Sequence, residues 1–143
     1  MPRIASSPAA DVIAQERFQE PANRRRLSGS AMRTFLKIAD CWDLPIAHQR
    51  ALLGWPAEST YFKHKSGDVA TLSYDTLVRI SLVIGIYKAL RILYPDVNLS
   101  HRWVHLPNTN LLFGGLAPVD QMAAGGIDAL YRVRRLLDSR VAG

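Results

Sequence analysis

The sequence has little of what marks several classes of protein. Its 143 residues include one cysteine, Cys41, which excludes an intramolecular disulfide framework and a cysteine-rich zinc site. The longest uninterrupted apolar run covers only residues 82–87, whereas a transmembrane helix needs about 20 such residues. The N-terminus lacks the hydrophobic stretch of a secretory signal, because Pro8 and Asp11 interrupt it. These absences predict a cytoplasmic protein with no membrane partner.

Recognisable catalytic motifs are also missing. The chain has no phosphate loop with P-loop spacing, no His-Glu-x-x-His and no Gly-x-Ser-x-Gly. His101 and His105 could share a helix face and bind a metal, but the residues between them offer no third ligand. A single cysteine is more often a small core residue than a nucleophile. We therefore expect no enzyme activity and no catalytic, cofactor-binding or metal-binding residue, with a metal-dependent enzyme at the two histidines as a minor alternative.

The charge is basic but diffuse. Lys and Arg number 18 against 12 Asp and Glu, which gives a net charge of +6. The excess is spread along the chain, as in an ordinary solvated surface, so it does not by itself indicate a nucleic-acid partner. The run Arg24-Arg25-Arg26 has two interpretations, a solvated linker or a basic arm that touches phosphates, and the first is favoured.

Apolar spacing indicates an all-α fold. Residues 1–29, punctuated by prolines, are expected to form an N-terminal tail, in which residues 11–20 could be helical. A first helix is expected to begin near Ser30, and proline and glycine then bracket short helices over 45–53 and 57–65. Three helices joined by short turns in this length outline a helix-turn-helix unit.

The fourth helix is predicted to be the spine of the protein. Ser73 is a good N-cap, and Pro95 ends the helix after Tyr94. Apolar residues surround most of its circumference, which is typical of a helix buried on all sides. Gly85 in its middle costs about 1 kcal/mol of helix propensity. We expect this glycine to let another helix approach closely.

Three further helices are expected, over 98–105, from Pro118 to Gly125, and from there to about Val141. The inner face of the last one is marked by Ile127, Leu130, Val133 and Leu137. The sequence thus predicts a helix-turn-helix domain over 30–88 that shares the long central helix with a small helical domain over 89–143.

The third helix is a candidate for contacts with DNA. It combines small hydroxyls with cations, which are residue types that bind phosphates and base edges. With Phe62 directed into the core, the expected DNA-binding residues are Ser59, Thr60, Lys63, His64 and Lys65. A short surface helix wetted by water has a similar composition, so this interpretation depends on the helix-turn-helix outline.

The C-terminal third contains a series of sequence motifs that is more specific than the helix-turn-helix outline. Its motifs are a Pro-Asn loop, a Phe-Gly-Gly turn, a proline-led short helix that ends at glycine, and a Val-Arg-Arg core in the last helix. They stand at Pro107-Asn108, Phe113-Gly114-Gly115, Pro118 to Gly125, and Val133-Arg134-Arg135-Leu136-Leu137. This series of motifs resembles the toxin-binding domain of Xre/MbcA/ParS-type antitoxins.

The resemblance extends upstream to about residue 30. Leu52-Leu53-Gly54 and Ser59-Thr60-Tyr61 are similar to the Xre-like helix-turn-helix of the same antitoxins. One departure is visible, because family recognition helices carry a Tyr-x-Arg-Trp-Lys-like run where this chain has Phe62-Lys63-His64-Lys65. The family's base preference is therefore not carried over.

The resemblance implies an antitoxin that binds a RES-domain toxin, which degrades NAD⁺ or ADP-ribosylates a target. It also implies a homodimer that binds operator DNA and represses its own operon. In the family the last helix and the tail cover the toxin's NAD⁺ pocket. The residues carried over as toxin-binding are Phe113, Tyr131, Arg134, Arg135, Asp138, Arg140 and Gly143. The alternative is a stand-alone helix-turn-helix repressor whose C-terminal domain only dimerises.

Overall fold

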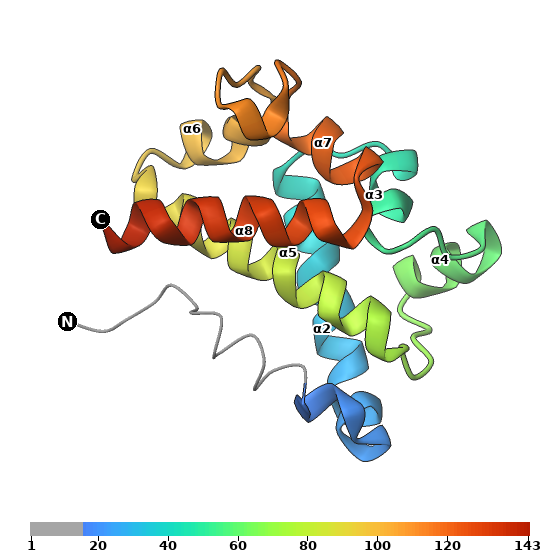
Figure 1. Ribbon diagram of the computed structural model, residues 1–143. Coiled ribbons are helices and arrows are strands. Elements are labelled where there is room, and N and C mark those ends of the chain that lie inside the picture. The colour runs from blue at the N-terminus through green and yellow to red at the C-terminus, as the bar shows by residue number, and fades with distance from the viewer. Residues whose placement is uncertain (1–15) are drawn as a thin grey trace.

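The computed structural model describes residues 16–143, and over this range the protein is all-α with no strand, as predicted. Figure 1 shows the helices stacked around a central one. In chain order the α-helices are α2 (Pro21–Cys41), α3 (Ile46–Leu52), α4 (Glu58–Lys65), α5 (Tyr74–Leu93), α6 (Val97–Arg102), α7 (Pro118–Ala124) and α8 (Gly126–Ala142), with short 3₁₀ turns η1 (Trp103–His105) and η2 (Leu111–Phe113) between α6 and α7. None of the helices in residues 16–143 is long and apolar enough to cross a membrane.

Helix α5 forms the spine, as the sequence predicts. The Ser73 hydroxyl oxygen accepts a hydrogen bond from the backbone N–H of Thr76 at 3.1 Å, which caps the helix at its N-terminus. Helix α2 packs on one side of α5 and α8 lies along another (Figure 1). The helix is therefore covered by both halves of the chain, and its buried residues are Leu77, Val78, Ile80, Leu82, Val83, Ile86, Ala89 and Leu90.

The first long helix begins at Pro21, so the expected start at Ser30 is wrong, and so is a tail over residues 21–29. Proline suits the first helical turn, where the backbone N–H has no partner inside the helix. Ser28 lies in this added part and is 2% exposed; its hydroxyl accepts the Leu72 N–H at 2.8 Å. The Arg24–Arg26 run stands on this helix. The helix considered over 11–20 falls largely outside the described residues.

The two short helices α3 and α4 match the predicted ranges closely. A turn with two left-handed residues, Gly54 at φ 87° and Trp55 at φ 61°, separates them. Their inner faces are joined by Gln49 of α3, whose side chain donates to the Leu44 carbonyl at 2.8 Å and accepts the Tyr61 hydroxyl proton. Buried polar groups with complete hydrogen bonding fix one relative arrangement of their elements. The hydrogen bond between Gln49 and Tyr61 therefore determines which side chains of α4 face outward.

The C-terminal elements pack on the spine from the other side. The helix expected over 98–105 is divided, because α6 ends at Arg102 and its last turn continues as η1. Trp103 points inward and meets Phe113 edge-on with ring centroids 5.9 Å apart. Helices α7 and α8 follow, and Leu130, Val133 and Leu137 of α8 are fully buried.

Candidate functional site

Helix α4 has an inward face different from the one expected. Tyr61 is fully buried and His64 is 7% exposed, whereas Phe62 is 47% exposed. The expectations that Phe62 points into the core and that His64 faces DNA are therefore wrong. Neighbouring residues on a helix lie about 100° apart, so Tyr61 and Phe62 cannot both point to the middle of one buried face. Tyr61 takes that place because Gln49 provides a hydrogen-bond partner there.

The other expected DNA-binding residues are exposed: Ser59, Thr60, Lys63 and Lys65. The outward face of α4 carries Ser59, Phe62 and Lys63, followed one turn later by Ser66, the C-cap residue. Their spacing of three, four and seven residues places them on one side of a helix. Phe62 was not singled out by sequence reasoning. The signal that could have found it is the spacing of Tyr61 and His64, which by themselves define an inward face.

The turn that leads into α4 is held by Arg50 of α3. Its Nε and Nη2 atoms donate to the Pro56 carbonyl at 3.1 and 2.9 Å, and its Nη1 lies 4.0 Å from a carboxylate oxygen of Glu58. The guanidinium carbon also lies 5.6 Å from the centre of the Trp55 ring, which is 57% exposed. Arg50 thus fixes where α4 starts and offsets the charge of Glu58 beside it.

The arginines of α8 have different surroundings. Arg134 is 2% exposed, and its Nε donates to Oδ2 of Asp138 at 3.1 Å. Arg135 is exposed, and its guanidinium carbon lies 5.3 Å from the centre of the Tyr131 ring. Arg140 is exposed near the end of the helix. Arg134 therefore belongs to the interior, whereas Arg135 and Arg140 are available to a partner.

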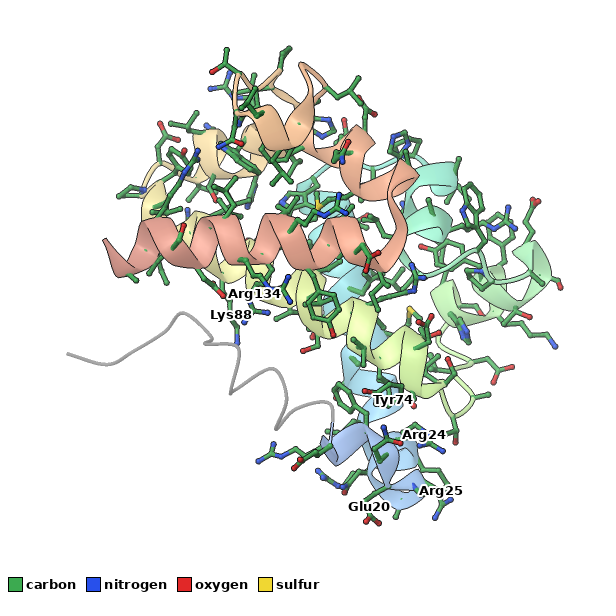
Figure 2. All side chains as sticks on the ribbon, in the orientation of Figure 1. Glu20, Arg24, Arg25, Tyr74, Lys88 and Arg134 are labelled. Atoms are coloured by element: carbon green, nitrogen blue, oxygen red, sulfur yellow. The ribbon has the colours of Figure 1, made fainter. Side chains whose placement is uncertain are left out.

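Arg134 fills the contact between α8 and α5. Figure 2 shows it directed from α8 toward the central helix. It lies over Gly85, so the expected close approach at this glycine is made by an arginine side chain. Phe113 is 1% exposed, packed against Trp103. The family resemblance places both Arg134 and Phe113 at the toxin contact; their burial corrects that expectation, because neither presents surface to a partner in this fold. Asp138 is drawn inward with Arg134, and its side chain is 17% exposed.

The two histidines considered for a metal have different partners. The Nε2 atom of His101 lies 3.1 Å from the Tyr87 hydroxyl, and a ring nitrogen of His105 contacts the Trp42 carbonyl. Burial, then the nearby Cys41, raises the pKa of Tyr87, so its hydroxyl keeps its proton. Within residues 16–143 no three His, Cys, Asp or Glu side chains gather as metal ligands would. The geometry thus gives these histidines roles in packing.

Comparisons with known proteins identify the C-terminal part. A family model described as the antitoxin Xre/MbcA/ParS C-terminal toxin-binding domain matches residues 89–143. The uncharacterized protein y4oB of Sinorhizobium fredii is 36% identical to this chain over 127 residues, which cover 89% of this chain and 96% of that protein. No solved structure matches this chain at a significant level. The residues matched by the family model run from the last part of α5 through α8, so they include the half-buried Tyr131 and the exposed Arg135.

Proposed function

Because this chain belongs to the Xre/MbcA/ParS antitoxin family, we propose that the toxin it neutralises is a RES-domain protein that consumes NAD⁺, by degrading it or by ADP-ribosylating a target. The antitoxin role and a toxin as protein partner follow from the matched toxin-binding domain. The antitoxin acts by covering the toxin's active site with the outer face and the end of α8. In this proposal it performs no catalysis of its own.

The observation that carries this proposal is the stacked pair of Tyr131 and Arg135 on the toxin-binding domain. Tyrosine and arginine are the residue types enriched among the few interface residues that dominate binding energy. The pair is held in place by its cation–π contact, so little side-chain freedom is lost when a partner covers it. Arg140 adds a further exposed cation about a turn and a half along the same helix from Arg135. Such cations would pair with carboxylates around the mouth of a toxin pocket.

The test is inhibition of the purified toxin's NAD⁺ consumption by the purified antitoxin. Arg135→Glu should weaken inhibition by about 30-fold or more, the loss expected when a dominant interface residue is reversed. Arg33→Glu on α2, an exposed arginine outside the matched domain, is the control and should inhibit as the unchanged chain does. Full inhibition by Arg135→Glu would contradict the proposed contact.

A shorter chain tests the role of the helix end. Deletion of residues 140–143 should abolish protection of cells that express the toxin. The deletion begins at Arg140 because Leu137 is fully buried and Asp138 is paired with Arg134, so an earlier cut would disturb the core. A shortened chain that still protects cells would show that the end of α8 does not cover the active site. It would leave the stacked pair as the essential contact.

We also propose that the chain, as a homodimer, binds operator DNA through α4 and represses its own operon, with the helix-turn-helix unit over residues 30–88. Support comes from the exposed Lys63 and Lys65 beside the Ser59 and Thr60 hydroxyls. Affinity for DNA from the upstream region should fall steeply with salt, and Lys63→Ala should reduce that slope by about 1. Absence of binding to this DNA would remove the repressor function and leave toxin neutralisation untouched. A stand-alone repressor would bind the DNA but give no protection against the toxin.

A further inference from the structure

An aromatic ring stands in the middle of the outward face of α4. Phe62 is 47% exposed, with Ser59 on one side and Lys63 on the other. Apolar surface left in water is unfavourable, so a partner that covers this ring gains free energy from its burial. A face that only had to be solvated could carry a polar residue at this position. Phe62 therefore offers a partner an apolar contact that the polar side chains of the same face do not.

The Phe62 ring has a single, exposed position, because the buried position on this helix is already occupied. Tyr61 fills the inward position completely and donates its hydroxyl proton to Gln49. Phe62 cannot turn inward without displacing it, because one residue along a helix is a rotation of about 100°. The two rings also touch, with centroids 6.3 Å apart and planes tilted by 48°. The Tyr61 ring thus supports one side of Phe62 and restricts its motion before any partner arrives.

The charges around Phe62 favour nucleic acid as the partner. Lys63 and Lys65 on the same short helix are exposed and can neutralise phosphates. The acidic residue of the helix, Glu58, lies 4.0 Å from Arg50, which offsets its charge. The major groove of DNA admits an α-helix, and its apolar feature at a base edge is the C5-methyl group of thymine. We propose that Phe62 is a specificity-determining residue that contacts a thymine methyl group in the operator. This inference rests on the proposed binding of operator DNA by α4.

The contact would select thymine for a physical reason. The phenyl ring has no hydrogen-bonding group, so it can gain only from apolar surface that it covers. At the same ring position, C5, cytosine has only a hydrogen atom, and its N4 amino group takes the place of the thymine O4, so cytosine offers no methyl group for the ring to cover. Uracil has the hydrogen-bonding groups of thymine but lacks the methyl group. Replacement of thymine by deoxyuridine therefore removes the proposed contact and nothing else.

The experiment measures binding of the full chain to a duplex from the region upstream of its gene. Footprinting defines the protected bases, and each protected thymine is then replaced singly by deoxyuridine. We expect at least one replacement per half-site to weaken binding about three- to fivefold, as for the loss of one buried methyl group. Phe62→Ala should bind the unmodified duplex as weakly as the unchanged chain binds the deoxyuridine duplex, and should not respond to the replacement.

Two controls separate a base contact from general damage. Val97→Ala on α6 removes an equally exposed apolar side chain, 47% exposed, and should keep the full sensitivity to deoxyuridine. Lys63→Ala should weaken binding to both duplexes by the same factor, since it acts on phosphates. Thermal unfolding of Phe62→Ala should match that of the unchanged chain, because the ring is outside the core.

Each result decides between the two proposals. If the unchanged chain binds the duplex but no thymine replacement weakens it, the Phe62 contact is overturned and operator binding stands. If Phe62→Ala keeps the sensitivity to deoxyuridine, another residue reads the methyl group and the inference is also overturned. If the chain binds no upstream DNA, operator binding itself fails and the contact fails with it.

Discussion

The guanidinium of Arg134 on α8 occupies the space above Gly85 on α5: a Cβ atom at Gly85 would lie 1.9 Å from Arg134 Nη1. This arginine is 2% exposed and donates a hydrogen bond to Asp138, so its side chain has little freedom to move aside. The contact explains why a glycine interrupts the middle of an otherwise strongly apolar helix. It also explains why two neighbouring arginines on α8 have different roles.

Gly85→Ala should destabilise the protein by about 1–3 kcal/mol, as overpacking of a filled core does. The gain in helix propensity, about 1 kcal/mol, acts in the opposite direction and does not offset the collision. The measurement is chemical unfolding followed by circular dichroism. Gly29→Ala on α2 is the matched control, because its Cβ would meet only Arg33 Nη1 at 3.3 Å. That variant should be as stable as the unchanged chain or more so.

Arg134→Ala and Arg135→Ala should separate stability from binding. Loss of Arg134 breaks a largely buried ion pair and should lower the free energy of unfolding by about 3 kcal/mol. Arg134→Met, which keeps most of the packing volume, should be less destabilising. Arg135→Ala should change stability by less than about 0.5 kcal/mol, since the residue is exposed. It should instead weaken toxin binding in calorimetry. Equal unfolding curves for the two alanine variants would contradict the assigned burial.

Stability should fall at alkaline pH because of Tyr61. Burial, and to a lesser extent the Asp40 carboxylate, raises the pKa of Tyr61 from 10.0 to about 12. The folded pKa exceeds the unfolded one, so this stabilisation is complete below pH 10 and is lost as the pH rises through about 12. A difference of two pKa units corresponds to about 3 kcal/mol.

Lysines also titrate in this range, so the comparison needs a control. Tyr61→Phe removes the phenol, and its unfolding free energy should depend less steeply on pH between 10 and 12 than that of the unchanged chain. The measurement is a set of unfolding curves at several pH values. Parallel pH profiles for the two proteins would show that Tyr61 does not titrate as its burial requires.

Ser28→Ala should lower the free energy of unfolding by about 1–3 kcal/mol, because it leaves the buried N–H of Leu72 without its acceptor. This variant tests the part of α2 that precedes Ser30. Ser30→Ala is the control, since its hydroxyl is exposed and bonds only the Leu27 carbonyl within its own helix. A Ser28→Ala protein as stable as the control would argue against the docked position of this segment.

Helix limits set by local chemistry could be predicted from the sequence. Ser73 caps α5, Pro45 precedes α3 and Pro118 opens α7, and each acts through its own backbone and nearest neighbours. From sequence alone, Pro21 fits a proline-punctuated tail and is equally suited to a first helical turn. What decides between the two is Ser28, whose partner Leu72 is distant in sequence. Local patterns do not contain that information.

The site was harder to predict than the fold. Arginine is almost always exposed, so the burial of Arg134 depends on Gly85, which only the packing of α5 against α8 brings beneath it. On α4 the choice between Tyr61 and Phe62 depends on Gln49 of another helix. Hydropathy alone favours the phenylalanine as the inward residue. In both cases, Arg134 on α8 and Gln49 beside α4, a polar side chain determines which residues are buried. The hydrophobic pattern of the sequence contains no information about such polar contacts.

Helix α5 runs from Tyr74 to Leu93, so it crosses residue 89, where the match to the toxin-binding domain begins. Recombination at that position would join residues 74–88 of α5 from one ancestor to residues 89–93 from another, and the hybrid helix would have to pack against both α2 and α8. The two halves are therefore not interchangeable modules. If the outside of α8 contacts the toxin as proposed, a change of toxin requires substitutions only on that surface and leaves α5 intact.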